Sequence, residues 1–174
     1  MTAEKVTARP IDLIVIHCAA TPNGRRHTAG DIDRWHRERG FNAIGYHFVI
    51  GIDGLIEPGR PLATAGAHAV NFNARSIGVC LIGSDRFTWS QWRSLEELIT
   101  RLRGEFPKAR ILGHRDLPRV AKECPGFDVR EWLARGMRPA DGEIFEESPT
   151  SGHHPLPGGE EPNRDPMAPP IRTS

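Results

Sequence analysis

Residues 11–17 read Ile-Asp-Leu-Ile-Val-Ile-His, a nearly continuous run of apolar and β-branched side chains. Such a run is typical of a strand that is covered on both faces, because a strand with one solvated face alternates apolar and polar side chains. A central strand of this kind needs a packing layer on each side of its sheet. The run ends at His17, so an imidazole with acid–base and metal-binding chemistry stands at the end of that strand.

Local patterns predict the remaining elements of the chain. Further strands are expected at residues 46–50, 55–57, 76–82 and 110–113. Helices are expected to begin after the capping residues Thr28, Thr88 and Asp128, each of which has an acidic or amide side chain three positions later. We therefore predict a single α/β domain in which helices flank a central mixed β-sheet.

The composition changes near residue 138. Residues 139–174 contain eight prolines and four glycines, with two basic and seven acidic side chains. Such a segment buries too little apolar surface to offset its ordering entropy, so we predict a folded domain over 1–138 and a disordered acidic tail over 139–174. The domain carries 21 basic and 15 acidic side chains, a net charge of +6. This balance suits an anionic partner, although arginines that only solvate a surface are the commoner explanation.

Several classes of protein are excluded by the sequence. No apolar run approaches the roughly 18 residues that a membrane span requires, and the amino terminus lacks the apolar centre of a secretory signal. We therefore expect a protein that is cytoplasmic on synthesis. The three cysteines, Cys18, Cys80 and Cys124, are too few and too unevenly spaced for a disulfide framework, which favours reduced thiols or a metal thiolate.

Three residues have metal-ligand chemistry and a plausible way of meeting. His17 and His114 each end a predicted strand, and Cys124 follows in a loop that contains proline. Two histidines and a thiolate form a three-ligand zinc set, which is typical of a catalytic site with one position left for water or substrate. The alternative is that the histidines only form hydrogen bonds and that the cysteine is a small buried apolar residue.

Five short stretches, taken in their order along the chain, resemble motifs of a known family. They are Ile-His-Cys-Ala-Ala-Thr at 16–21, Gly-Tyr-His-Phe at 45–48, Asn-Ala-Arg-Ser-Ile-Gly-Val-Cys-Leu at 73–81, Gly-His-Arg-Asp at 113–116 and Lys-Glu-Cys-Pro-Gly at 122–126. Together they resemble the type 2 amidase family, which comprises zinc-dependent N-acetylmuramoyl-L-alanine amidases and peptidoglycan recognition proteins. The likeness extends from about residue 11 to residue 133, and its phage branch is the most similar.

The resemblance implies roles for particular residues. It assigns one zinc ion per chain to His17, His114 and Cys124, and catalytic assistance to Tyr46 and Lys122. The reaction would be hydrolysis of the lactyl amide between N-acetylmuramic acid and L-alanine, with a zinc-activated water as the nucleophile and the tyrosine and lysine as donors to the oxyanion. From the residues alone, the favoured interpretation is that Tyr46 is a half-buried strand aromatic and Lys122 a solvated loop charge.

A related branch of the family differs at two positions. It carries a glutamate general base at the position of Cys80, and often an aspartate at that of Cys124. Cysteines at both positions follow the phage branch, so we expect proton transfer without a carboxylate. Glu57 and Asp116 remain alternative carboxylates for proton transfer, but nothing in their spacing requires that role.

The family counterpart of residues 68–76 borders the substrate groove. The resemblance therefore implies that His68, Asn73 and Ser76 bind the stem peptide or the sugar, whereas simple turn hydrogen bonds are the alternative for Asn73 and Ser76. Arg75 and Arg115 are expected to pair with stem-peptide carboxylates, because the guanidinium fork suits bidentate contacts.

The predicted function is that of a bacteriolytic phage endolysin, which a holin or an export route brings to the cell wall. Its partner is peptidoglycan, and we expect a monomer with no direct nucleic-acid binding. Two alternatives stay open. The first is a non-catalytic peptidoglycan-binding domain, and the second is an additional role in binding and inhibiting a phage RNA polymerase, which the resemblance to phage members suggests.

Overall fold

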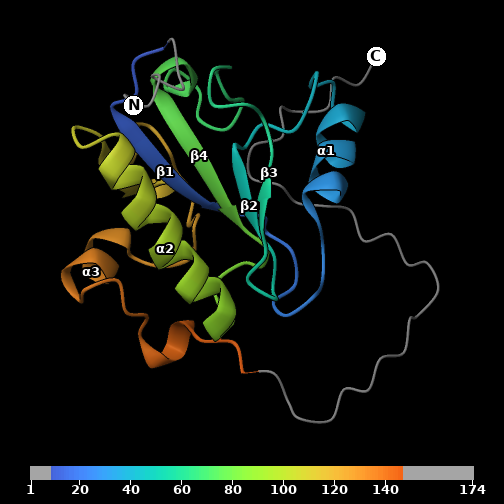
Figure 1. Cartoon of the computed structure of the whole chain (residues 1–174). Helices are drawn as coiled ribbons and strands as arrows, with labels where there is room; N and C mark the ends of the chain where they lie inside the picture. Colours follow the sequence, from blue (N-terminus) through green and yellow to red (C-terminus); the bar gives the residue numbers. More distant parts are fainter. Residues whose placement is uncertain (1–8, 147–174) are drawn as a thin grey trace, which may run out of the picture.

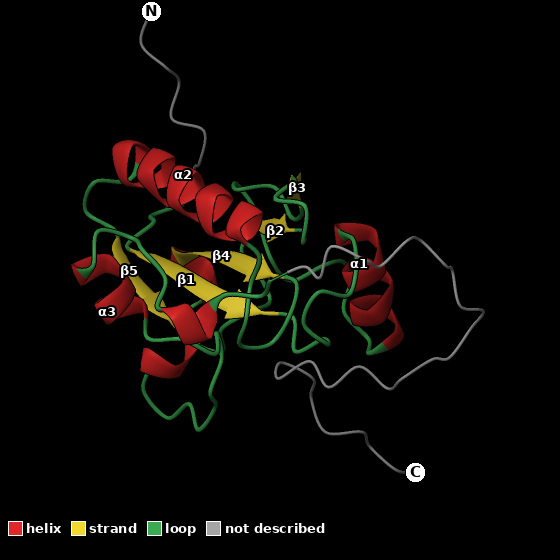
Figure 2. Ribbon diagram, turned by 90° about the horizontal axis from the view of Figure 1, so that it is seen from below, coloured by secondary structure: helices red, strands yellow, loops and turns green. Residues whose placement is uncertain are grey.

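The computed structural model describes residues 9–146, which contain a five-stranded sheet in the order β3-β2-β4-β1-β5 (Figure 1 and Figure 2). The strands are β1 (Leu13–Cys18), β2 (Phe48–Ile50), β3 (Ile56–Pro58), β4 (Ser76–Leu81) and β5 (Arg110–Gly113). β4 and β5 pair in parallel with β1, β2 pairs in parallel with β4, and only β3 is antiparallel to its neighbour. The predicted mixed sheet of an α/β domain is confirmed.

The three helices are α1 (Ala29–Glu38), α2 (Trp89–Glu105) and α3 (Val129–Ala134). Short 3-10 turns occur at η1 (Asn73–Arg75), η2 (His114–Asp116) and η3 (Asp141–Glu143). The predicted capping residues are present, because Thr28 and Thr88 each form a reciprocal capping box and the Asp128 side chain accepts the Glu131 N–H. These caps satisfy amide groups that the first helical turn leaves without a partner.

One face of the sheet is an apolar core. Alternate residues of β1 and β4 point to it and pack under α2 and α3, and Figure 2 shows α2 lying along the sheet. The buried side chains from these four elements include Ile14, Ile16, Ile77, Val79, Trp92, Leu95, Leu98, Ile99 and Trp132. This face supplies most of the large apolar burial in the domain.

The opposite face is mixed in character. Its apolar part lies where Ile32 of α1 packs near Val49 and Cys80. The residues of β1 and β4 on this face include His17 and Gly78, since they alternate with the apolar set. One face of the sheet is therefore an apolar core, whereas the other combines apolar packing with buried polar side chains.

A buried histidine holds β2 and β4 together on this second face. His47 is 1% exposed; its Nδ1 accepts the Gly78 N–H at 3.0 Å, and its Nε2 lies 3.0 Å from the Thr64 carbonyl oxygen. Burial, with smaller contributions from the charges of Arg9 and Arg60, lowers the pKa of His47 from 6.5 to about 4. The folded protein thus keeps this imidazole neutral at pH values where the unfolded chain protonates it.

The folded part of the chain extends beyond residue 138. Phe87 pairs with the segment that follows η3, because its N–H donates to the Glu143 carbonyl and its carbonyl accepts the Phe145 N–H, both at 2.9 Å. The Phe145 ring packs against Gly24, and Trp92 Nε1 donates to the Glu143 carbonyl at 3.3 Å. Residues 139–146 of the predicted tail are therefore ordered against the domain; residues 147–174 lie outside the described residues.

Within residues 9–146, no helix combines the length and the apolar character that crossing a membrane requires.

We expect truncation after Arg138 to destabilise the domain. It removes three hydrogen bonds made by the backbone of Glu143 or Phe145 to the body of the protein, each contributing about 1 kcal/mol to the free energy of unfolding, and an exposed hydrogen bond from Arg135 to the Glu143 carboxylate. The melting temperature should fall by several degrees, roughly as expected for a domain of this size. The matched control ends at Glu146, and equal melting temperatures for the two truncations would contradict the proposed packing of 139–146.

The buried histidine predicts a dependence of stability on pH. Below about pH 6.5 the unfolded chain binds a proton at residue 47, whereas the folded protein does so only near pH 4. The free energy of unfolding should therefore decrease as the pH falls through this window, by on the order of 3 kcal/mol from this one group. Urea unfolding of the wild type and of His47→Gln tests this. The variant should show a shallower dependence, and parallel profiles would refute it.

Candidate active site

Two imidazoles meet because the strands that carry them are parallel. His17 is the fifth residue of β1, and His114 directly follows β5, whose Gly113 is paired with Ile16. The carboxyl ends of parallel strands lie at the same edge of a sheet, so both rings are delivered to one place. Their centroids are 4.5 Å apart, and His17 and His114 are 0% and 5% exposed.

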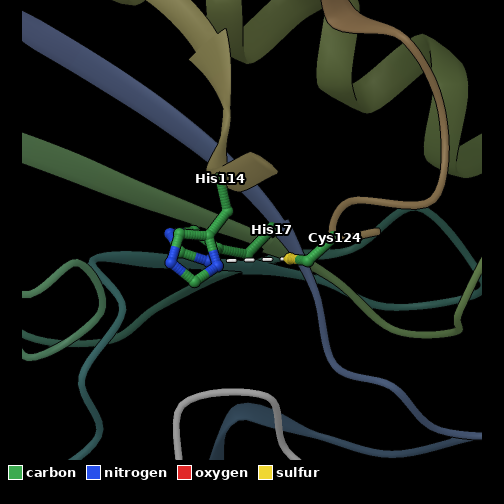
Figure 3. A group of neighbouring side chains, drawn as sticks. All are labelled: His17, His114 and Cys124. Carbon is green, nitrogen blue, oxygen red and sulfur yellow. Dashed lines mark hydrogen bonds between the residues drawn. The ribbon is translucent and has the colours of Figure 1, made fainter. Parts of the chain in front are cut away.

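The third residue of the site comes from the loop before α3. The Arg115 N–H donates to the Cys124 carbonyl at 2.8 Å, and the Cys18 N–H points at Cys124 Sγ at 3.3 Å. These contacts place the sulfur 3.8 Å from His17 Nδ1. Figure 3 marks this contact with a dashed line. Ligand atoms of His17, His114 and Cys124 all lie within 4.8 Å of one another.

The electrostatics of this cluster fit a buried metal site. Burial, followed by the nearby charges of His68, His114 and Lys122, lowers the pKa of His17 well below 6.5, so its ring is neutral as a ligand must be. A hydrogen bond with the Cys18 side chain, followed by burial, raises the pKa of the Cys124 thiol. A cation would have to displace that proton on binding.

The two residues expected to assist catalysis lie beside the cluster. Tyr46 is 1% exposed, and its ring centroid is 5.1 Å from that of His17. Lys122 is exposed, and its charge is among the causes that lower the pKa of His17. The structure thus brings together the three metal-ligand candidates and Tyr46, and Lys122 lies in the exposed part of the loop two residues before Cys124.

Two of the residues expected to bind substrate are buried next to His17 and do not lie on an open surface. His68 and Ser76 are both 0% exposed. His68 Nδ1 is 2.9 Å from His17 Nε2, and His68 Nε2 is 3.1 Å from Ser76 Oγ. This contact with a metal-ligand candidate was not predicted from the sequence, although the glycine inside the buried run 76–81 is a signal of close approach by another group.

The remaining groove candidates have structural partners. The side-chain oxygen of Asn73 accepts the backbone N–H groups of His68 and Ala69, the turn role that was the alternative for it. Arg75 pairs with Asp12 at 2.9 Å; both precede their strands and so lie at the opposite edge of the sheet from His17 and His114.

Arg115 adjoins the cluster through its backbone. Its side chain, about a quarter exposed, lies 3.2 Å from Asp128 and 3.9 Å from Glu123. The neighbouring carboxylate alternatives are also engaged. Glu57 accepts the Ala29 N–H at the start of α1, and Asp116 accepts the Gly113 N–H. Neither contact directs a carboxylate to the metal-ligand candidates.

The chain matches known proteins over most of the described domain. A family model described as N-acetylmuramoyl-L-alanine amidase matches residues 7–127. The endolysins of Enterobacteria phage K11 and Escherichia phage T7 are 37% and 36% identical to it over 129 residues, which cover 70% of this chain and 84% of each endolysin. Peptidoglycan-recognition protein LB of Drosophila melanogaster is 35% identical over 67% of this chain and 55% of its own length.

Solved structures agree with these sequence matches. The N-acetylmuramoyl-L-alanine amidase LysC from Clostridium intestinale aligns with a TM-score of 0.65 at 32% identity, covering 78% of this chain and 89% of LysC. Drosophila PGRP-LB aligns with a TM-score of 0.64 at 28% identity, covering 83% and 88%. The matched region includes the strands and loops that carry His17, His114 and Cys124. The chain belongs to the N-acetylmuramoyl-L-alanine amidase family.

Proposed function

We propose that this protein is a zinc-dependent endolysin that cleaves the lactyl amide between N-acetylmuramic acid and L-alanine in peptidoglycan. The observation that carries the zinc requirement is the buried cluster of His17, His114 and Cys124, whose ligand atoms lie within 4.8 Å of one another. The endolysin role is supported by the similarity to the phage K11 and T7 endolysins over 84% of their length.

The donor set fits zinc. Two imidazole nitrogens and one sulfur are preferred zinc ligands, and three protein ligands are the number that a catalytic site uses. When bound, zinc supplies a Lewis acid that polarises a carbonyl and lowers the pKa of water toward 7. The neutral state of the His17 ring favours such binding, because no proton has to leave it.

Tyr46 and Lys122 are proposed to stabilise negative charge on the carbonyl oxygen of the scissile amide. A tyrosine hydroxyl and a lysine ammonium are both hydrogen-bond donors, and a donor aimed at a developing oxyanion is among the strongest catalytic contributions. Burial fixes Tyr46 beside His17, so its hydroxyl loses little freedom when it acts. Lys122 is exposed and two residues from Cys124, which leaves it able to meet an incoming polymer.

A protein that only binds peptidoglycan would not need the metal cluster. All three ligand candidates are present here and lie together, which favours catalysis over a purely binding role. Release by a holin and binding of a phage RNA polymerase stay predictions; the second rests on the resemblance and on the positive charge of residues 1–138. A pull-down with the cognate polymerase would test it.

We expect the purified protein to hold one zinc ion per chain and to lose it in His17→Ala, His114→Ala and Cys124→Ala, because each removes one of three ligands. Metal analysis and the release of new amino termini from peptidoglycan measure the two effects. Cys80→Ala is the matched control, since Cys80 is a buried cysteine paired with His17 in the sheet and lies outside the cluster. Full zinc occupancy in the Cys124 variant would overturn the site, and new reducing ends would indicate a glycosidase.

Tyr46→Phe and Lys122→Ala should each lower turnover by about 10² to 10³, as loss of an oxyanion donor does. Zinc content should stay unchanged, because neither residue is a ligand. The exposed Lys108, which precedes β5 at the far edge of the sheet, provides the control Lys108→Ala. Turnover within a few-fold of wild type at full zinc occupancy would return Tyr46 and Lys122 to structural roles.

A further inference from the structure

His68 connects a metal-ligand candidate to the interior of the protein. Its Nδ1 lies 2.9 Å from His17 Nε2, and its Nε2 lies 3.1 Å from Ser76 Oγ. All three side chains are 0% exposed. They form one continuous chain of hydrogen bonds in which each ring nitrogen of His68 has a partner.

The fold reserves a space for this ring. A Cβ atom at Gly78 would lie 2.6 Å from His68 Cγ, so the ring rests on the strand where β4 has no side chain. A Cβ at Gly66 would also collide with the ring, and one at Gly45 would collide with the Ala67 carbonyl. Glycine is thus needed at three points for the loop to approach the sheet closely.

The backbone of His68 is fixed as well. Asn73 Oδ1 accepts the N–H groups of His68 and Ala69, at 2.8 and 2.9 Å. The ring therefore has little freedom to turn, and the direction of its two nitrogens is set by the fold before any ligand binds.

Metal binding selects one direction of proton donation along the chain. The nitrogen of His17 that faces Cys124 Sγ is Nδ1, and it must present a lone pair to act as a ligand. The proton of the neutral His17 ring then resides on Nε2 and is donated to His68 Nδ1. His68 in turn carries its proton on Nε2 and donates it to Ser76 Oγ.

We propose that His68, supported by Ser76, is a positioning residue that holds His17 in the tautomer and orientation needed for metal binding. This inference rests on the zinc site of the proposed function and adds a residue that acts through a ligand. The partner that orients a metal-bound histidine is commonly a carboxylate or a carbonyl. Here a second neutral imidazole takes that place.

His68→Leu removes the acceptor and should weaken zinc binding by about 10- to 100-fold, the usual effect of losing such a partner. His68→Asn should recover most of the affinity, because the asparagine Oδ1 occupies the position of the histidine Nδ1. Ser76→Ala should have a smaller effect in the same direction. Zinc affinity is measured by competition with a chromophoric chelator.

The matched control is His47→Leu. His47 is a buried imidazole whose ring centroid is 5.8 Å from that of His68, but its nitrogens contact Gly78 and Thr64 instead of His17. This variant should have a lower melting temperature and an unchanged zinc affinity. An equal loss of zinc affinity in His47→Leu and His68→Leu would mean that both act only through stability, and would overturn the proposal.

Nitrogen-15 NMR of the histidine rings in the zinc-loaded wild type gives a readout that does not depend on activity or on a variant that folds. We expect the proton of His17 on Nε2 and that of His68 on Nε2. A proton on His68 Nδ1, or wild-type zinc affinity in folded His68→Leu, would overturn the proposal. If the wild type bound no zinc at these ligands, the proposed function itself would fail, which metal analysis distinguishes.

Discussion

Five imidazoles are buried in this small domain, and their need for hydrogen bonds shapes the face of the sheet on which they lie. His17, His36, His47, His68 and His114 are all at most 5% exposed. A buried polar ring without a partner destabilises a protein by a few kcal/mol, so these rings must be satisfied within the fold. His36 accepts the Gly45 N–H, His47 accepts the Gly78 N–H, and His68 joins His17 to Ser76. The loops and glycines on this face follow from that requirement.

Burial of apolar side chains on the other face of the sheet offsets the free energy that burying these imidazoles costs. Trp92 and Trp132, together with the leucines of α2, are almost completely buried against β1 and β4. Burying a large apolar side chain contributes roughly 1.5 to 3 kcal/mol. One side of the sheet can therefore stabilise the domain while the other carries polar groups in fixed directions. The same strands serve both purposes, because successive side chains point to opposite faces.

The elements could be predicted from sequence because their signals are local. The capping boxes at Thr28 and Thr88 and the apolar run ending at His17 each lie within a few residues, and the structure contains each of them. The metal-ligand candidates could be named from their residue types and predicted strand ends, but the family resemblance was needed to prefer a zinc site over histidines that only form hydrogen bonds, because nothing local links His17 to His114. The contact between His68 and His17 was not predicted, since it depends on a loop that returns to the sheet through three glycines. The glycine in the buried run 76–81 is the one feature that indicated it.

The extent of the ordered domain and the position of Arg75 were beyond sequence reasoning for a different reason. Proline and acidic residues indicated a tail from residue 139, but the pairing of Phe87 with Glu143 and Phe145 is a long-range backbone contact that composition does not encode. Arg75 lies near the family groove motif in sequence. β4 has six residues, so its two ends lie roughly 15 to 20 Å apart. Arg75 precedes β4 and is therefore far from the edge of the sheet at which His17 and His114 lie.

The loop that carries Cys124 shows how a ligand outside the sheet can still be held rigidly. Its carbonyl accepts the Arg115 N–H, and its sulfur accepts the Cys18 N–H, so it is fixed both to the residue after His114 and to the end of β1. Arg115 also reaches Asp128, the residue that caps α3. The intervening residues 117–123 are largely exposed apart from Leu117. Because the anchors lie at the two ends of the loop, the position of the sulfur is fixed without support from the exposed middle, whereas His17 is fixed by its place inside β1.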